Sequence, residues 1–244
     1  MPELLELDNI SKDFGGLRAV NRVSLAAHEG EILGLIGPNG AGKTTLFNMI
    51  TGVYRPSAGR VLLRGEDITR LSAHQRCKRG IARSFQLVRP FPELTVLENV
   101  AVGRIYGRDA VWNRRRAEAD ALAMLDRVGL AGRAQEQAKH LTLVDRKRLE
   151  LARALATRPI LLLLDELLAG LNPTEVLETM DLIRALRESG TTIIMVEHVV
   201  TAIFGISDRV AVMSAGERIA EGTPALVARD ARVIDAYLGT AHAT

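Results

Sequence analysis

The strongest chemical signal in the sequence is the glycine-rich segment GPNGAGKTT at residues 37–45. It matches the pattern G-x-x-x-x-G-K-[ST], with an apolar run before it and a helix-forming segment after it, as the motif requires. Glycines let successive backbone N–H groups converge on phosphate oxygens at the N-terminus of a helix. We therefore predict that this segment binds a nucleoside triphosphate. Its residues are Gly37, Pro38, Asn39, Gly40, Ala41, Gly42, Lys43, Thr44 and Thr45.

Two residues of this segment and two acids far downstream could complete a site for magnesium and water. Lys43 is expected to reach the β- and γ-phosphates, and the Thr44 hydroxyl to ligate Mg²⁺. The segment ILLLLDE places Asp165 and Glu166 at the carboxyl end of an apolar strand, where ligands bind in open α/β sheets. One carboxylate there can hold the metal, and the next can orient or deprotonate water. Adjacent acids are also common turn residues. We interpret this pair as part of a magnesium and water site because the same chain carries a phosphate-binding segment.

A parallel α/β sheet must position these groups, because apolar strands alternate with helices in the last third of the chain. The helix at 173–189 is well marked: Asn172 is a suitable N-cap, Pro173 suits the first turn and Gly190 suits the end. The middle third is predicted to be helical and to be inserted into this sheet. The predicted strands are 4–10, 23–27, 32–36, 60–63, 160–164, 191–196 and 209–213, and the middle helices are 95–106, 113–128 and 143–157.

Composition excludes several classes of protein. Hydrophobic residues make up 47% of the 244 residues and charged residues 25%, which is typical of a globular chain. A net charge of +3 is too small to indicate nucleic-acid binding by itself. Cys77 is the only cysteine, so an internal disulfide is impossible, and we expect a half-buried residue there. No apolar stretch approaches the roughly 18 residues of a membrane span, and the start does not resemble a signal peptide.

Further segments, in their order and spacing, indicate a family. With them the chain resembles the ATP-binding subunit of ABC transporters over essentially its full length. A finer similarity points to the ATPase of branched-chain amino-acid importers, although related subunits serve urea, amides and lipopolysaccharide export. The segments for the family are SFQ at 84–86, LTLVDRKRLELARALATRP at 141–159, AGLNPTE at 169–175 and IIMVEHV at 193–199. Those for the subgroup are FGGLRAV at 14–20, RSFQLVRPFPELTVLENV at 83–100, AGLNPTE again and VIDAYLG at 233–239.

The resemblance implies an ATPase that powers transport, with ATP and Mg²⁺ as cofactors. Its fold would be α/β, that of a P-loop NTPase with a RecA-like mixed-sheet core, an antiparallel β subdomain and a helical subdomain. Residues 1–244 would form a single ABC ATPase domain. The nucleotide-binding core would comprise about 1–86 and 159–244, and the helical subdomain about 87–158.

The same resemblance implies partners. Integral-membrane permease subunits would hold the chain peripherally at the cytoplasmic face of the inner, or plasma, membrane and would dock on the helical region from about 87 to 130. A second ATPase subunit would complete the enzyme, and a periplasmic or lipid-anchored solute-binding protein would act indirectly. No nucleic acid is expected. The transported solutes would be branched-chain or other hydrophobic amino acids or related small solutes.

The resemblance also gives residue roles. Phe14 would stack on adenine, and Gln86 would join the metal to movements of the permease. Asp165 would bind the metal with Thr44 and Gln86, Glu166 would position the attacking water, and His198 would contact the γ-phosphate. Taken alone, Phe14 could be a core aromatic residue and His198 a hydrogen-bonded histidine at a strand end.

One segment departs from the family pattern. Leu141, Thr142, Leu143, Val144 and Asp145 stand where the family has the signature L-S-G-G-Q, which completes the ATP site of the opposite subunit. Thr142 can cap the helix and form a capping box with Asp145. Val144 is expected to obstruct the close backbone approach that glycine allows, and Asp145 to add negative charge near phosphate.

This departure favours a heterodimer with a paralogous ATPase over a homodimer, because each site pairs one chain's phosphate-binding segment with the other's signature. Leu167, in place of the usual proline after the two acids, is a milder departure. The basic residues of 139–158 are expected to form mostly a solvated face and positions in the helix interior, and not a nucleic-acid-binding surface.

Other classes of function stay open. A soluble ABC-type ATPase acting on nucleic acid or the ribosome would use the basic cluster Arg114–Arg116 beside Trp112, although an exposed helix face is the commoner explanation of such a cluster. The ATPase of a lipopolysaccharide-type exporter is a second alternative. A GTPase would need the guanine-binding motif N-K-x-D, which the sequence does not contain.

Overall fold

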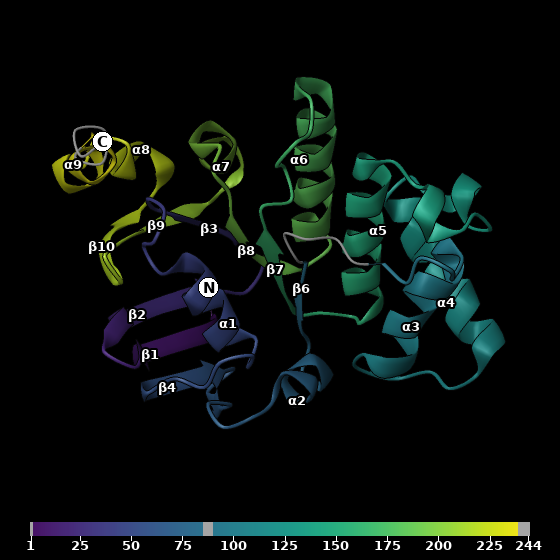
Figure 1. Ribbon diagram of the computed structural model, residues 1–244, viewed down its shortest axis with the longest axis horizontal. Coiled ribbons are helices and arrows are strands. Elements are labelled where there is room, and N and C mark those ends of the chain that lie inside the picture. The colour runs from purple at the N-terminus through teal and green to yellow at the C-terminus, as the bar shows by residue number, and fades with distance from the viewer. Residues whose placement is uncertain (1, 85–89, 239–244) are drawn as a thin grey trace.

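The core of the fold is a six-stranded sheet (Figure 1), and the residues of interest lie at the carboxyl ends of its inner strands. The computed structural model describes residues 2–84 and 90–238. Neighbouring strands are parallel from β6 through β7, β8 and β3 to β9, and β10 runs antiparallel to β9. The predicted parallel α/β core is therefore confirmed. In spatial order the strands are β10 (Glu217–Gly222), β9 (Arg209–Ser214), β3 (Ile32–Ile36), β8 (Thr192–Val196), β7 (Leu161–Asp165) and β6 (Ile81–Arg83).

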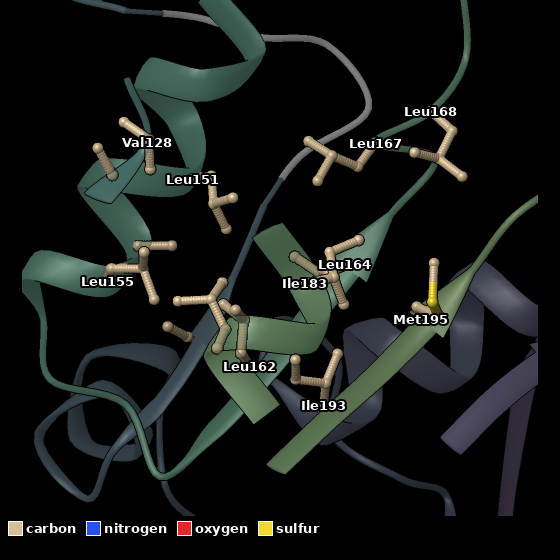
Figure 2. Close-up of a cluster of buried hydrophobic side chains, with 14 of the residues drawn as sticks. Val128, Leu151, Leu155, Leu162, Leu164, Leu167, Leu168, Ile183, Ile193 and Met195 are labelled. Carbon is tan, nitrogen blue, oxygen red and sulfur yellow. The ribbon is translucent and has the colours of Figure 1, made fainter. Parts of the chain in front are cut away.

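The central strands are buried on both faces, which explains why they are continuous apolar runs. Successive side chains point to opposite faces. In β7, Leu161 and Leu163 belong to one hydrophobic cluster, while Leu162 and Leu164 belong to another. Figure 2 shows the second cluster, which joins β7 and β8 to side chains of α5 (Leu143–Ala156) and α6 (Pro173–Glu188). The sheet thus separates two cores.

The first cluster joins the six-stranded sheet to a second, antiparallel sheet. This sheet has the order β2 (Leu17–His28), β1 (Glu3–Phe14), β4 (Ala58–Leu63) and β5 (Glu66–Asp67). Helix α1 (Lys43–Ile50) packs in the same cluster through Leu46 and Phe47, both fully buried. The predicted antiparallel β part is confirmed, with longer strands than the sequence indicated at 4–10 and 23–27.

The helices α3, α4 and α5 gather at one end of the molecule (Figure 1). Capping explains where several helices begin: the Asn172 side chain accepts from the Glu175 N–H at 3.0 Å, as predicted, with Pro173 in the first turn. None of the helices within residues 2–84 and 90–238 combines the length and the hydropathy of a membrane span. The helices are α2 (Ala73–Lys78), α3 (Val96–Tyr106), α4 (Arg114–Arg127), α5 (Leu143–Ala156), α6 (Pro173–Glu188), α7 (Val200–Ile206), α8 (Pro224–Val227) and α9 (Ala231–Leu238), with short 3-10 turns η1 (Ala131–Arg133) and η2 (Ala138–His140).

Candidate functional site

The phosphate-binding segment joins β3 to α1 and needs glycine at two enclosed positions. Gly37 and Gly42 have φ angles of 151° and 97°, which favour glycine. A Cβ atom on Gly37 would lie 2.1 Å from the carbonyl oxygen of Met213, and one on Gly42 would lie 2.6 Å from that of Ala19. Side chains are therefore excluded at both positions. The chain can turn here only with bare backbone, which is also what lets N–H groups approach a phosphate closely.

Lys43, the first residue of α1, lies folded back against the loop. Its Nζ donates hydrogen bonds to the carbonyl oxygens of Gly37 at 2.7 Å and Pro38 at 3.0 Å, and the residue is only 7% exposed. Burial lowers the pKa of Lys43, whereas the nearby carboxylates of Glu166 and then Asp165 raise it. The phosphate-binding segment and the two downstream acids therefore share one site, as the sequence predicts.

The remaining predicted nucleotide contacts surround Lys43. Asn39 and Gly40 are exposed at the tip of the loop, and Ala41 is buried beneath it. Thr44 is exposed and Thr45 is half-buried in the first turn of α1. The first N–H groups of a helix have no intrahelical acceptors, so this turn offers donors and a positive dipole end to an anion.

Asp165 ends β7 and is almost completely buried. Its Oδ2 accepts a hydrogen bond from the Arg83 guanidinium at 2.5 Å, and both side chains are nearly inaccessible to solvent. Arg83, the last residue of β6, also donates to the Asn48 side chain and lies over the Phe47 ring. Sequence reasoning did not identify Arg83, although its place at the end of a strand beside β7 is the signal that could have done so.

Glu166 and His198 follow adjacent strands, and their side chains meet. Nε2 of His198 lies 2.8 Å from Oε1 of Glu166. The backbone of Glu166 has a φ of 51°, and its N–H donates to the carbonyl oxygen of Val196 at 2.9 Å. The His198 side chain is about half exposed, whereas that of Glu166 is only 14% exposed. This pair and Asp165 lie together at the carboxyl ends of β7 and β8. The Glu166 carboxylate, a possible base, is therefore next to the polar ring of His198.

Glu197 is a buried acid that no sequence motif marks. It is 3% exposed, and its Oε1 accepts a hydrogen bond from the N–H of Leu168 at 2.8 Å. Burial raises the pKa of Glu197 to about 7, although this hydrogen bond and Lys147 oppose the shift. Its position directly after the apolar strand β8 and before His198 was the available signal.

This acid should make folding stability depend on pH. The pKa of Glu197 in the folded chain is about 7, above its ordinary value of 4.5, so the folded state holds the proton more tightly. The resulting stabilisation is complete below about pH 4.5 and is lost as the pH rises through about 7, by roughly 3 kcal/mol at most. Glu197→Gln removes this dependence. We therefore expect its melting temperature, relative to wild type, to be several degrees higher at about pH 8 than at about pH 5.

Thermal unfolding across this pH range, followed by circular dichroism, measures the difference. Glu178→Gln is the control, because Glu178 is exposed and pairs with Arg148 at the surface. A difference between wild type and Glu197→Gln that stays constant with pH would show that Glu197 does not bind its proton more tightly in the folded chain.

The signature segment forms the start of α5. Thr142 is its N-cap, as predicted, because its hydroxyl oxygen accepts from the Asp145 N–H at 3.3 Å. The prediction of a capping box is wrong in its second half: the Asp145 carboxylate accepts from the Thr142 hydroxyl at 2.7 Å, not from the N-cap backbone. Leu141 is buried, whereas Leu143 is 53% exposed and Val144 is half-buried.

The charge of Asp145 is paired within the chain. Arg133 in η1 forms an ion pair with Asp145 and another with Glu136 at 2.7 Å. From sequence alone Asp145 is added negative charge near phosphate, because a partner twelve positions away leaves no local pattern. The cation of Arg133 offsets that charge at the helix start.

Most other basic residues around α5 are paired at the surface. Arg148 pairs with Glu178 at 2.6 Å, and Arg158 lies 3.6 Å from Asp120. Lys147 does not belong to this solvated face, because it is only 6% exposed. Its ammonium points inward and donates to backbone carbonyl oxygens of the turn after β7.

The basic cluster at the start of α4 lies on an exposed helix face. Arg114 pairs with Glu118 at 2.6 Å, and the exposed Trp112 packs edge-on against Tyr106. Cys77 is half-buried with a free thiol, as expected.

Two further predicted site residues are Phe14 and Gln86. Phe14 ends β1 with 41% of its surface exposed, and its ring contacts the Tyr54 ring edge-on at 5.2 Å between centroids. An exposed aromatic face at this position is compatible with adenine stacking, which stays a prediction. Gln86 lies outside the described residues.

Comparison with known proteins gives the family. Residues 20–169 match the family described as "ABC transporter", and residues 217–243 match the "Branched-chain amino acid ATP-binding cassette transporter" family. The high-affinity branched-chain amino acid transport ATP-binding protein LivG of Escherichia coli K12 is 44% identical, over 98% of each chain. The lipopolysaccharide export system ATP-binding protein LptB of Haemophilus influenzae is 36% identical, over 97% of each chain.

Solved structures agree with this assignment. The ADP conformation of MJ1267, an ATP-binding cassette of an ABC transporter, superimposes with a TM-score of 0.88 at 32% identity, over 98% of this chain and 100% of the other. A dimeric post-hydrolysis state of the cassette MJ0796, bound to ADP and Pi, gives 0.82 at 27% identity, over 91% and 99%. The chain therefore belongs to the ABC transporter family, as an ATP-binding subunit that hydrolyses ATP.

Proposed function

We propose that this chain powers an importer of branched-chain amino acids or related hydrophobic solutes. The match of residues 217–243 to the branched-chain family and the likeness to LivG support this class of solute. The hydrolytic part rests on one observation, the contact between Glu166 and His198 beside the buried Lys43. A carboxylate held next to a polar ring, at the edge where phosphates bind, is suited to positioning water for attack on phosphorus.

The site fits Mg²⁺ carried by a nucleotide. The Thr44 hydroxyl and the Asp165 carboxylate are hard oxygen ligands, and Mg²⁺ takes one or two of these together with phosphates and water. Across residues 2–84 and 90–238 there is no cluster of three or more His, Cys, Asp or Glu side chains that could hold a metal ion. The donor set therefore suits a metal that arrives with the phosphates. When bound, Mg²⁺ would neutralise the charge that develops on the β- and γ-phosphate oxygens.

The residues of the chain then have distinct roles in this proposal. Lys43 turns from the loop carbonyls to the β- and γ-phosphates. A cation binds these anionic oxygens more strongly than it binds neutral carbonyl oxygens. Glu166 holds the attacking water in line with the γ-phosphate and accepts its proton. His198 donates a hydrogen bond to the γ-phosphate and keeps the Glu166 carboxylate oriented. Phe14 stacks on the adenine, and Gln86 links the metal to the permease.

A groove beside this site is suited to a loop of an integral-membrane permease. It encloses about 310 Å³ between α2 and β6 on one side and α3 and α5 on the other. Val53 and Tyr106 on its walls are exposed hydrophobic side chains, and Arg153 and Glu150 form an ion pair at 3.0 Å within it. We place the boundary between nucleotide-binding core and helical subdomain here, near 87 and 158. The permease would hold the chain peripherally at the cytoplasmic face, and a solute-binding protein would act on the permease.

Cysteine crosslinking tests the groove. In a Cys77→Ser background, which removes the thiol that lines the groove, Val102→Cys or Tyr106→Cys should crosslink to co-expressed permease subunits. The expected yield is at least about tenfold above that of Leu226→Cys, which is 68% exposed on α8, far from the groove. Mass spectrometry identifies the crosslinked product.

The control position is matched in exposure to Tyr106, which is 61% exposed, so reagent access does not explain a difference between these two positions, whereas Val102 is half-buried. Equal yields at Val102, Tyr106 and Leu226 would show that the permease does not occupy the groove, whatever the activity of the ATPase.

A further inference from the structure

The catalytic glutamate proposed above stands on an unfavourable backbone conformation. Glu166 has a φ of 51°, in the left-handed region that residues with a side chain rarely adopt. Such residues persist only where the surrounding structure holds them in place, and they concentrate at active sites. The contacts that hold the turn at 166–168 therefore bear directly on where the Glu166 carboxylate points.

The side chains after Glu166 anchor the turn from one side. Leu167 and Leu168 are 5% and 2% exposed, and both belong to the hydrophobic cluster between the sheet, α5 and α6 (Figure 2). Leucine in place of the family's proline at 167 thus adds apolar burial. Apolar packing cannot supply hydrogen bonds to the backbone of the turn. Its buried N–H and C=O groups therefore need polar partners from elsewhere.

Lys147 supplies those partners from α5. Its Nζ donates to the carbonyl oxygen of Leu167 at 2.8 Å and to that of Glu166 at 3.2 Å. In the same turn, the Glu197 carboxylate accepts a hydrogen bond from the N–H of Leu168 at 2.8 Å. Two buried ionisable side chains, Lys147 of α5 and Glu197 directly after β8, therefore hold three consecutive residues.

Burial of the Lys147 ammonium needs an explanation, because desolvation disfavours the charged form. Burial lowers the pKa of Lys147, and the carboxylates of Glu197 and then Glu166 oppose this shift. The adjacent Arg148 behaves differently, since it reaches the surface and pairs with Glu178. An apolar side chain would fill the position of Lys147 without desolvation cost but would leave the two carbonyl oxygens without this donor.

We propose that Lys147 is a positioning residue for ATP hydrolysis. It fixes the turn so that the Glu166 carboxylate stays against His198, and it ties that carboxylate to α5. The N-terminus of the same helix carries the signature segment, so engagement of the signature by the opposite subunit's nucleotide is transmitted to this chain's own Glu166. The inference rests on the proposed role of Glu166.

Lys147→Met tests it, because methionine has a similar length and no N–H donor. In the full chain assembled with permease and partner ATPase, the expected kcat is about 10- to 100-fold lower, since small misplacements of a catalytic group have effects of this size. The KM for ATP should stay within about threefold, because the nucleotide contacts remain. Lys147→Arg should recover most of the rate, and Arg148→Met on the same helix should leave it unchanged.

Hydrogen exchange gives a readout that does not depend on activity. In the nucleotide-free full chain, amides of 165–171 should exchange at least about fivefold faster in Lys147→Met, and not in Arg148→Met. If Lys147→Met fails to fold, Lys147→Leu, which also has no N–H donor, takes its place, and the same outcomes apply to it.

Two failures are distinguishable. If Glu166→Gln turns over ATP as fast as wild type, the proposed role of Glu166 is wrong. If Glu166→Gln is inactive while Lys147→Met keeps wild-type kcat and exchange, only the role of Lys147 is overturned. A double variant no slower than Glu166→Gln alone supports the proposal, whereas independent multiplication of the two losses contradicts it.

Discussion

Replacing Lys43 with alanine should weaken the binding of a fluorescent ATP analogue by more than about 100-fold in a chain that remains folded. The Lys43 ammonium is nearly buried and held by two loop carbonyl oxygens, so it is already placed where phosphates would bind. Hydrogen bonds between charged groups are roughly twice as strong as neutral ones, and several are lost together. Equilibrium titration followed by fluorescence measures the change, and circular dichroism verifies folding.

Lys78→Ala is the matched control, because Lys78 also donates to a backbone carbonyl oxygen, that of Gly107, but lies in α2. Its affinity for the analogue should equal that of wild type. A folded Lys43→Ala chain that binds as tightly as wild type would mean that the glycine-rich segment does not hold the phosphates.

The core strands could be predicted because they are buried on both faces. Strands β3, β7 and β8 lie within about a residue of their predicted bounds, as continuous apolar runs leave little choice. Strand β10 was missed, because its sequence ERIAEG is mostly polar and it lies at the edge of the sheet. The hairpin of β1 and β2 was predicted too short for the same reason, since its outer residues are polar and exposed.

In the candidate site, too, some residues could be predicted from the sequence and others could not. Short contiguous motifs predict Lys43, Asp165, Glu166 and His198. The structure brings all four together at the carboxyl ends of the strands. The residues that hold them were not predictable from local pattern. Arg83 reaches Asp165 from 82 positions away. Lys147 looked like one more surface cation in a basic helix, and only the fold shows that it turns inward to the backbone after β7.

The other large effect concerns how two ATP sites are shared. In the reconstituted transporter, Glu166→Gln in this chain should lower ATP turnover by about 100-fold, because a positioned base contributes about 10²–10⁴ to such reactions. We expect the corresponding change in a paralogous partner ATPase to lower turnover by less than about twofold. The asymmetry follows if only the site built on this chain's phosphate-binding segment meets a signature with glycines. Steady-state phosphate release by the two variant complexes measures it.

The structural reason lies at the start of α5. Its first N–H groups have no intrahelical acceptors and would face the opposite subunit's γ-phosphate. Thr142 caps this turn and Arg133 pairs with Asp145, so neither the cap nor the charge is the obstacle. Val144 remains, a half-buried β-branched side chain where glycine would let the phosphate approach the backbone. Loss of one well-placed donor can lower turnover by about 10²–10³.

Val144→Gly isolates this cause. Purified alone, the wild-type chain should bind ATP but hydrolyse it slowly, because both sites of a homodimer would meet Val144. Val144→Gly should raise that rate about tenfold or more, even though glycine in the first turn disfavours the helix slightly. Val144→Ala, which keeps a small side chain and favours the helix, should give an intermediate rate, separating obstruction from helix stability. If the isolated wild-type chain instead hydrolyses ATP as fast as the whole transporter, the helix start tolerates valine, and a homodimer becomes as acceptable as a heterodimer.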